Sequence, residues 1–376
     1  MTEPAHRGLI PALDGVRGIA ILLVLIHHFT LYRPTRGIDH WIAAVPVGGW
    51  MGVDVFFVLS GFLITGILLD SRDSPHYFKS FYARRSLRIF PLYYLVLFLA
   101  LIVLPHFATL HTVIVGPYEN PPAWPYWTYL TNFSVADRDL VHGWLDLAWS
   151  LAIEEQFYIV WAVVMFVCPV RWVGPLCAAI LIGEPIARAI AIANGVPALS
   201  IYMLTWFRLD GLAMGALLAW LLRRGWLEKL SAGVTPAVAA GLAALVAITV
   251  ASGDAWWMTP LMQRYGFSVV AFTAAAMVIA AVHKPADSLW TRALSAGWLR
   301  AFGKYSYCLY LTHLPVMRLM RAYVFDPFDY EALAIAPWIG QVLFYLVATI
   351  PSFALAWVSW RVFEAPILRL KAKFPY

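Results

Sequence analysis

The chain has 376 residues, of which 62% are hydrophobic and 13% charged, and its mean hydropathy is +0.73. Soluble domains carry about 25% charged residues, so this composition excludes an ordinary soluble protein and indicates a polytopic protein of the lipid bilayer. The net charge of +6 follows from a cytoplasmic excess of Lys and Arg and gives no reason to expect nucleic acid as a partner. Three scattered cysteines lack pair or metal-ligand spacing, so we expect neither a disulfide nor a metal site.

Apolar runs of about 20 residues predict an all-α fold with about ten membrane-spanning helices. The expected spans cover residues 10–31, 49–69, 87–105, 148–169, 175–193, 207–224, 233–252, 264–283, 303–323 and 337–361. Because Lys and Arg concentrate in alternate connections, we place both the N- and the C-terminus in the cytoplasm. No clear internal repeat is visible and few stretches resemble linkers, so we interpret residues 1–376 as one domain.

The first span contains several ionisable residues in the sequence LDGVRGIAILLVLIHHF, residues 13–29. Such residues are costly inside a bilayer and mark functional sites by default. On a helix, Arg17 and His28 lie within about 20° of one face, and Asp14 lies about 40° from His28. His28 is about 16 Å along the axis from Arg17, which predicts a corridor from one membrane surface to an imidazole near the midplane. The alternative is a snorkelling Arg17 and a His28 that only bonds to a neighbouring helix.

The second span opens with GVDVFFVLSGFLIT, which places Asp54 and Ser60 in an apolar run. Their offset of six residues corresponds to about 240°, so the two side chains lie on different faces of the helix. A carboxylate within an apolar run is a functional hint. Asp54 is therefore either part of the site or a helix-end cap.

The third span begins at the cytoplasmic side with YARRSLRIFPLYY. Arg85 and Arg88 are three residues apart and share a helix face, with Arg84 alongside. By the predicted topology, Arg17 lies at the same mouth. These guanidinium groups suit bidentate capture of phosphates from a cytosolic ligand, although the positive-inside bias explains them equally well.

The fourth span opens with WSLAIEEQFYIVW, in which Glu154 and Glu155 are expensive unless they are paired or near water. Either carboxylate could orient a histidine or accept a hydroxyl proton. The alternative is a salt bridge to Arg208 or another outer arginine. We expect Arg208 and Asp210 of the sixth span to be structural, and His313 of the ninth span to be a hydrogen-bonded packing residue.

The longest non-cytoplasmic segment, about residues 106–147, is rich in proline and aromatic residues. Its prolines forbid a regular span, but the aromatic portion could dip back into the protein and line a cavity. Trp124 and Trp127 could stack on a sugar ring or anchor the membrane interface, and the sequence favours neither.

Seven motifs in order resemble the membrane-bound acyltransferase 3 family. They are LDGVRGIAILLVLIHHF, GVDVFFVLSGFLIT, RRSLRIFPLYY, WSLAIEEQFY, FRLDGLAMGALLAW, YSYCLYLTHLPV and WRVFEAPILRL. They span residues 13 to about 370, and seven strings in family order make the resemblance specific. The resemblance implies an O-acyltransferase that moves an acyl group, usually acetyl, from cytosolic acyl-CoA to a hydroxyl. The acceptor is commonly a free or lipid-linked sugar of an envelope or exported glycan, and in some relatives a macrolide antibiotic.

The resemblance also implies residue roles, because the family's Arg and His, R-x-x-R and acidic-pair motifs match positions of this chain. His28 is expected to be a catalytic base or acyl carrier; the HF ending and the offset from Arg17 favour it over His27. The expected catalytic residues are His28, Asp14, Glu154 and Glu155. The expected acyl-CoA-binding residues are Arg17, Arg84, Arg85 and Arg88. The expected substrate-binding residues are Asp54, Ser60 and Trp149.

Many relatives append an extracellular hydrolase-like domain, and we expect none here because the last motif lies near the end of the sequence. The expected location is the bacterial cytoplasmic (inner) membrane. A transporter that uses Asp14, Arg17 and His28 as a proton or substrate relay is the main rival interpretation. It would have inverted repeats with broken helices, which are not visible in the sequence. A non-catalytic scaffold would explain the spans but not the arginine mouth.

Overall fold

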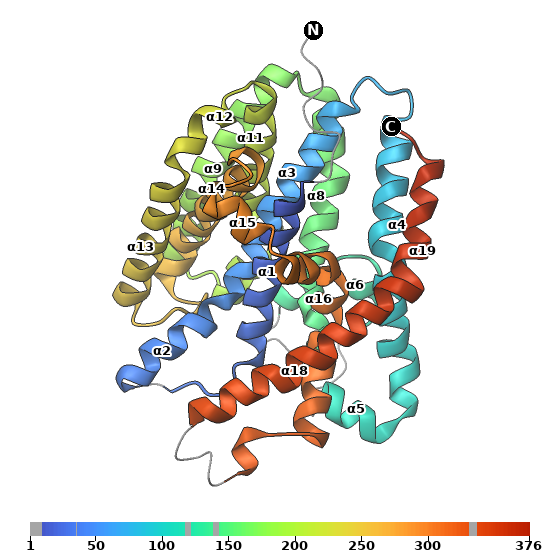
Figure 1. Ribbon diagram of the computed structural model, residues 1–376, viewed down its shortest axis with the longest axis vertical. Helices are drawn as coiled ribbons and strands as arrows, with labels where there is room; N and C mark the ends of the chain where they lie inside the picture. The colour runs from blue at the N-terminus through green and yellow to red at the C-terminus, as the bar shows by residue number, and fades with distance from the viewer. Residues whose placement is uncertain (1–9, 35, 117–121, 138–142, 331–336) are drawn as a thin grey trace.

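The computed structural model describes residues 10–34, 36–116, 122–137, 143–330 and 337–376. Within these ranges the chain is helical and contains no β-strand, as the sequence predicts (Figure 1). The long helices are α1 (Pro11–Phe29), α2 (Gly37–Val47), α3 (Gly52–Asp70), α4 (Tyr77–Phe98), α8 (Ala148–Val167), α9 (Val170–Ala193), α11 (Leu209–Arg223), α13 (Val234–Ser252), α14 (Phe267–His283), α16 (Gly297–Tyr323) and α18 (Pro337–Ser359). The short helices are α5 (Ala108–Val115), α6 (Trp124–Trp127), α7 (Thr131–Ala136), α10 (Ala198–Met203), α12 (Leu227–Leu230), α15 (Leu289–Leu294) and α19 (Ala365–Leu368).

Eight helical segments of the described chain are long and apolar enough to cross a membrane. The protein is therefore an all-α, polytopic integral membrane protein. The two remaining predicted spans are present as helices, but α11 has only 15 residues, and α16 has 27 residues with basic side chains along its length. By itself α11 is too short, and α16 too polar, to be identified as a membrane span. The count of ten spans therefore stays a prediction.

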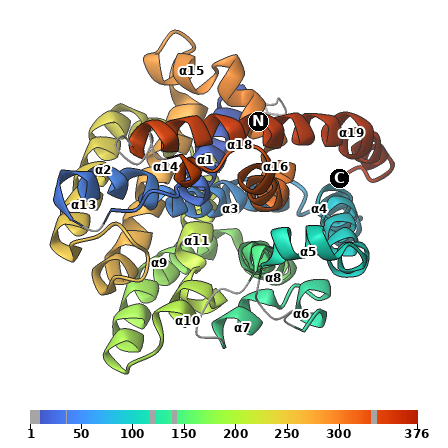
Figure 2. The ribbon, with the colours of Figure 1, turned by 90° about the horizontal axis from the view of Figure 1, so that it is seen from below.

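Helix α1 lies near the centre of the bundle, in contact with α3, α14, α16 and α18 (Figure 2). It approaches α16 closely because glycines remove the side chains between the two backbones. A Cβ atom on Gly303 would come within 1.8 Å of the carbonyl oxygen of Asp14, and one on Gly18 within 2.1 Å of that of Leu299. Small residues allow membrane helices to pack in this way. The polar residues of α1 and α16 are consequently brought together.

The arginine-rich start of α4 and the C-terminal segment lie at the same end of the molecule (Figure 1). Arg84 donates to the backbone carbonyl oxygens of Lys371 and Phe374, each at 3.1 Å. Arg17, near the start of α1, lines the same cavity as Arg88 of α4. The beginning of the first helix and the C-terminal segment therefore share one end. That this end faces the cytoplasm stays a prediction.

The segment after α4 packs against the bundle through short helices instead of crossing it. The backbone oxygen of the buried Tyr126 accepts a hydrogen bond of 2.7 Å from Tyr93, and Trp127 stacks on Tyr94 with ring centres 5.8 Å apart. Trp124, in contrast, is 61% exposed. Two pieces of the predicted segment, 117–121 and 138–142, lie outside the described residues.

Candidate active site

Helices α1, α3, α4, α8 and α16 surround a polar cavity of about 790 Å³, its open mouth included. We refer to it as the arginine cavity. Its polar lining consists of Arg17, Ser60, Arg85, Arg88, Ser150, Glu154, Glu155, Tyr158, Ser306, Tyr307 and Tyr310. These residues come from segments that are far apart in the sequence. The structure thus brings together the arginines, the acidic pair and Ser60, all of which the sequence singled out.

Three guanidinium groups face the arginine cavity from α1 and α4. Arg17 forms an ion pair of 2.7 Å with Asp14 on its own helix. Arg85 and Arg88 form neither a hydrogen bond nor an ion pair with any described residue, and each lies over an aromatic ring at 5.7 Å and 5.5 Å respectively. Guanidinium groups recognise phosphate and carboxylate oxygens through paired N–H donors. This end of the cavity can therefore bind a multiply charged anion.

Arg84 does not line this cavity, which corrects the expectation that it helps to hold the same anion. Its guanidinium group bonds to two backbone carbonyl oxygens of the C-terminal segment and lies 4.8 Å from the ring centre of Tyr376. The reason is helical geometry, because Arg84 is about 100° around the helix from Arg85. Arg84 therefore fastens the C-terminal segment to α4.

Two carboxylates lie on the α8 wall of the arginine cavity. Glu154 accepts hydrogen bonds from the hydroxyl groups of Ser60 at 2.9 Å and Tyr158 at 2.6 Å. Glu155 is buried, and its Oε1 has no hydrogen-bond partner among the described residues. The alternative of a salt bridge between this pair and Arg208 is wrong, because Arg208 pairs with another carboxylate. Glu154 is thus held in place, whereas Glu155 presents an unsatisfied acceptor.

His28 of α1 and His313 of α16 form a side-chain pair. Nε2 of His313 lies 3.0 Å from Nδ1 of His28, and the ring centres are 4.8 Å apart. Nδ1 of His28 is also 3.0 Å from the carbonyl oxygen of Val24, one turn earlier on its helix. His313 was expected to be a hydrogen-bonded packing residue, and it is fully buried and hydrogen-bonded. The sequence did not indicate that its side-chain partner is His28.

The hydrogen bonds define the tautomers of both neutral rings. Nδ1 of His313 faces the carbonyl oxygens of Leu309 at 3.0 Å and Tyr310 at 2.9 Å, which can only accept, so this nitrogen carries the proton. The Nε2 of His313 is then a lone-pair acceptor. Nδ1 of His28 faces this acceptor and the oxygen of Val24, so it donates to both. Nε2 of His28 is left unprotonated, as a base or nucleophile requires.

No carboxylate among the described residues contacts His28. Asp14, expected as an orienting group, bonds to Arg17 instead. Its offset of 14 residues from His28 corresponds to about 21 Å along the helix, which is too far for any direct contact. A shared helix face does not bring the two side chains together, because the axial separation excludes the interaction. The side chain that lies at hydrogen-bond distance from His28 is the imidazole of His313.

The arginine cavity stops short of the histidine pair at Tyr310. The Tyr310 hydroxyl lies 2.6 Å from that of Ser150 and donates to the carbonyl oxygen of Leu147 at 3.1 Å. Tyr310 and His313 are three residues apart on α16, so His313 begins about one turn beyond the end of the cavity. The predicted corridor from Arg17 to His28 is therefore not continuous in this structure: its lining reaches Tyr310, whose ring centre lies 6.1 Å from that of His313.

Asp54 and Trp149 lie in a separate buried cluster and do not line the arginine cavity, in contrast to the expectation that they bind substrate. Asp54 pairs with Arg208 at 2.7 Å, and both side chains are fully buried. Arg208 also lies over the ring of Trp149 at 5.6 Å. The helical offset that separates Asp54 from Ser60 directs the carboxylate toward α11, away from the cavity. The structural role expected for Arg208 is supported by this pairing.

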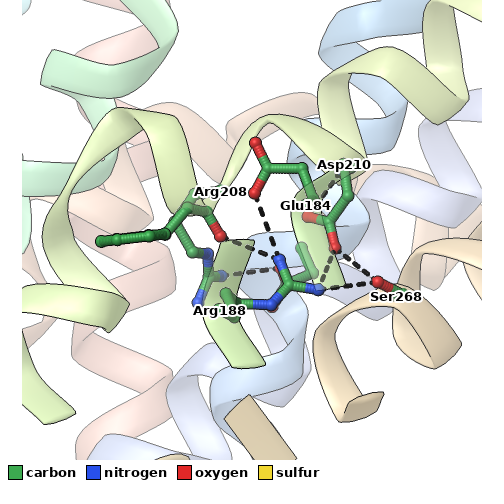
Figure 3. Close-up of polar contacts among 8 residues, drawn as sticks. Glu184, Arg188, Arg208, Asp210 and Ser268 are labelled. Atoms are coloured by element: carbon green, nitrogen blue, oxygen red, sulfur yellow. Dashed lines mark hydrogen bonds and ion pairs between the residues drawn. The ribbon is translucent and has the colours of Figure 1, made fainter. Parts of the chain in front are cut away.

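The buried cluster continues through Arg188 of α9 (Figure 3). Arg188 donates to Asp210 at 3.0 Å and Ser268 at 2.7 Å, and it forms a longer ion pair of 3.4 Å with Glu184. Two arginines thus form ion pairs with three carboxylates, one each from α3, α9 and α11, inside the bundle. Buried charges need such partners because an isolated charge is expensive to remove from water. This cluster ties together four helices next to the site.

His27 has different surroundings from His28. Its Nδ1 lies 2.6 Å from the carbonyl oxygen of Val47, and its ring stacks on Trp256 with centres 5.6 Å apart. The rings of His27 and His28 meet edge to face at 5.0 Å. His27 therefore joins α1 to α2 and to the segment after α13. The choice of His28 over His27 as the reacting histidine stays a prediction.

Tyr310 was not singled out from the sequence, and His313 was expected only as a hydrogen-bonded packing residue. Both belong to the motif YSYCLYLTHLPV, where Ser306, Tyr310 and His313 are spaced by four and three residues. This spacing places them on one helix face and could have predicted a polar stripe facing α1. The pairing of His313 with His28 depends on how α16 packs on α1, which the spacing alone does not reveal.

Comparisons with known proteins agree with the geometry. A family model described as an acyltransferase domain, that of acyltransferase 3, matches residues 10–361. The chain is 29% identical to the peptidoglycan O-acetyltransferase OatA of Listeria monocytogenes over 97% of its length and 57% of that protein. It is 27% identical to O-acetyltransferase OatA of Staphylococcus aureus over 95% of its length and 57% of that protein. The chain thus spans little more than half the length of these relatives. No solved structure gives a significant match.

Proposed function

Because the chain belongs to the acyltransferase 3 family, we propose that it is a membrane O-acetyltransferase that acts on a cell-envelope glycan. The observation that carries the proposal is the arginine cavity, with two unpaired guanidinium groups at one end and a histidine pair one helical turn beyond the other. The names of the relatives in Listeria and Staphylococcus support acetyl as the group transferred, and that of the Listeria protein supports peptidoglycan as the acceptor class. The cytoplasmic membrane of a bacterium is the corresponding location.

The donor in this proposal is acetyl-CoA that enters from the cytoplasm. Its phosphates would bind to Arg85 and Arg88, which form no ion pair or hydrogen bond with a described residue, with Arg17 beside them. The distance of about 16 Å from Arg17 to His28 along α1 suits a long, thin arm such as that of coenzyme A. The charged nucleotide would then stay at the membrane surface while the acetyl thioester approaches the midplane. The Tyr310 ring must turn aside for this arm to reach His28.

The reacting atom on the protein would be Nε2 of His28. As a general base it would take the proton of the acceptor hydroxyl while the oxygen attacks the thioester carbon. A C–O bond forms, the C–S bond breaks, and the coenzyme A thiolate leaves. His313 would hold Nδ1 of His28 protonated and accept a stronger hydrogen bond as the imidazolium forms. Transient acetylation of the same Nε2 is the other route, and it needs the same tautomer.

The two carboxylates of the cavity have distinct roles in this proposal. Glu154, fixed by Ser60 and Tyr158, would keep the wall of the cavity rigid and polar. Glu155, with its unsatisfied oxygen, would accept a hydrogen bond from the amide or hydroxyl groups of the coenzyme A arm. Neither would act on His28 directly, because neither contacts it.

The test is acetyl transfer by the purified protein in proteoliposomes, with radiolabelled acetyl-CoA and isolated glycan strands. We expect transfer by the wild type, loss of transfer in His28→Ala, and retained transfer in His27→Ala. Full activity of His28→Ala with loss in His27→Ala would overturn the assignment of the reacting residue. Movement of glycan or protons without consumption of acetyl-CoA would instead identify a transporter.

A further inference from the structure

A second cleft of about 960 Å³, its open space included, lies beside the histidines and on the side away from the arginine cavity. We call it the outer cleft. It is lined by Arg33, Pro34, His40, Ala43, Ala44, Val47, Gly253, Asp254 and Trp256. These residues belong to the connection after α1, to α2 and to the segment after α13. In Figure 1, α2 lies toward the opposite end of the molecule from the C-terminus.

Three polar atoms of the outer cleft have no partner among the described residues. Arg33 donates through Nε to Thr30 and through Nη2 to His27, both backbone oxygens at 3.2 Å, which leaves Nη1 unused. Asp254 accepts from the backbone N–H of Trp256 through Oδ1 at 3.0 Å, which leaves Oδ2 unused. The indole Nε1–H of Trp256 also makes no hydrogen bond to a described residue. The cleft thus presents two donors and one acceptor.

The rings around Trp256 orient these groups. His27 stacks on the indole with ring centres 5.6 Å apart, and the Arg33 guanidinium lies 5.3 Å from the indole centre. The indole is therefore held in place by its neighbours. His40 bridges the two walls, with its ring nitrogens 3.1 Å from the oxygen of Pro34 and 2.8 Å from that of Gly253. The cleft is consequently formed before any ligand binds.

The outer cleft borders the proposed reacting residue through His27. Two of its lining residues, Val47 and Trp256, contact the His27 ring directly, and that ring meets His28 edge to face at 5.0 Å. A ligand in the cleft would lie on the side of the histidines opposite to the arginines. A donor and an acceptor that enter from opposite ends would meet at His28 without passing one another.

We propose that the outer cleft binds the acceptor as a hydroxyl-rich, uncharged sugar unit of a glycan, through Arg33, Asp254 and Trp256. This inference rests on the proposed function and assigns the position of its acceptor. The unused carboxylate oxygen of Asp254 would repel an anion, so the cleft does not favour a strongly anionic ligand such as a nucleotide. The unused donors of Arg33 and Trp256 and the unused acceptor of Asp254 match the hydroxyl groups of a sugar, because each hydroxyl can both donate and accept a hydrogen bond.

The test uses two conservative variants of the full chain in nanodiscs. Asp254→Asn keeps the Oδ1 bond to the backbone and turns the free acceptor into a donor, and Trp256→Phe keeps a ring but removes the N–H. Trp226→Phe is the matched control, because Trp226 is exposed and does not line the cleft. The probe is tetra-N-acetylchitotetraose with acetyl-CoA as donor. Binding of the same probe to the His28→Ala protein is measured separately, so that it does not depend on turnover.

For Asp254→Asn and Trp256→Phe we expect the KM or Kd for the tetrasaccharide to rise about tenfold, the cost of one lost hydrogen bond to a bound ligand. The KM for acetyl-CoA should stay within about twofold, because the arginine cavity is untouched. Unchanged affinity in both variants, or a loss in Trp226→Phe instead, overturns the outer cleft. Wild-type protein that binds the tetrasaccharide in the cleft but never transfers acetyl groups would overturn the proposed function alone.

Discussion

Replacement of His313 by alanine isolates the contribution of the histidine pair. The change removes the Nε2 acceptor that lies 3.0 Å from Nδ1 of His28, while the oxygen of Val24 at 3.0 Å remains. His28 should therefore keep its proton on Nδ1, and the ground state should lose little stabilisation. In the transition state His28 becomes cationic, and a hydrogen bond to a charged group contributes about 1 to 1.5 kcal/mol more than a neutral one. That difference corresponds to about a tenfold lower kcat.

The assay is steady-state acetyl transfer, with kcat and the KM for acetyl-CoA determined separately. We expect kcat to fall about tenfold in His313→Ala and the KM to stay within about twofold, since only transition-state stabilisation is lost. His313→Gln should recover most of the rate, because its amide oxygen reaches the position of Nε2. His313→Asn is the matched control: its shorter amide keeps the bonds to the helix carbonyl oxygens but does not reach His28.

The Gln and Asn variants of His313 distinguish a hydrogen bond to His28 from a purely structural role. Equal rates in the Gln and Asn variants would show that His313 only supports the packing of α16. A kcat of His313→Ala equal to the wild type would show that the imidazole pair has no part in the reaction. Size-exclusion profiles and thermal unfolding of each variant in detergent identify any that fails to fold.

Three further changes test the rest of the site and the fold. Arg85→Gln or Arg88→Gln should raise the KM for acetyl-CoA about tenfold or more, because charged hydrogen bonds to the donor are lost. Arg84→Gln should leave this KM within about twofold. Equal effects of all three variants would refute the assignment of the arginine cavity as the acetyl-CoA site. Asp54→Ala leaves the buried guanidinium of Arg208 unpaired, which should lower the free energy of unfolding by about 3 to 5 kcal/mol. The thermal unfolding temperature of this variant should therefore drop clearly. An unchanged temperature would contradict the buried ion pair. Tyr310→Phe loses the hydroxyl hydrogen bonds that hold the ring at the end of the cavity. Hydrolysis of acetyl-CoA in the absence of acceptor should therefore rise about two- to tenfold. A fall in this hydrolysis would exclude Tyr310 as a barrier between the cavity and His28.

The buried ion cluster of α3, α9, α11 and α14 shows why some polar residues in spans are misread as site residues. Asp54 lies in an apolar run, as a site residue would, but it serves to neutralise Arg208. The sequence contains both charges, yet the two residues are 154 positions apart along the chain. Only the packing of α3 on α11 shows that they meet.

Apolar run length and local helix geometry were enough to predict the helical membrane fold and the face of α1 that carries Arg17 and His28. Both depend on interactions within about 20 neighbouring residues: the transfer of apolar side chains into lipid and the 3.6-residue period. For this reason Arg17 and His28, and likewise Arg85 and Arg88, could be grouped by their spacing. The motif resemblance extended this grouping to Glu154 and Glu155, which lie on another helix.

The partners of these residues were decided by tertiary structure. Whether His28 meets a glutamate or His313 depends on which helix lies against α1 and at what height. The close contact at Gly303 sets that height, because it lets α16 slide against α1 until His313 faces His28. A one-turn shift of α16 would move His313 by about 5.4 Å and break the pair. Such a register is a property of two packed surfaces, and no spacing within one helix contains it.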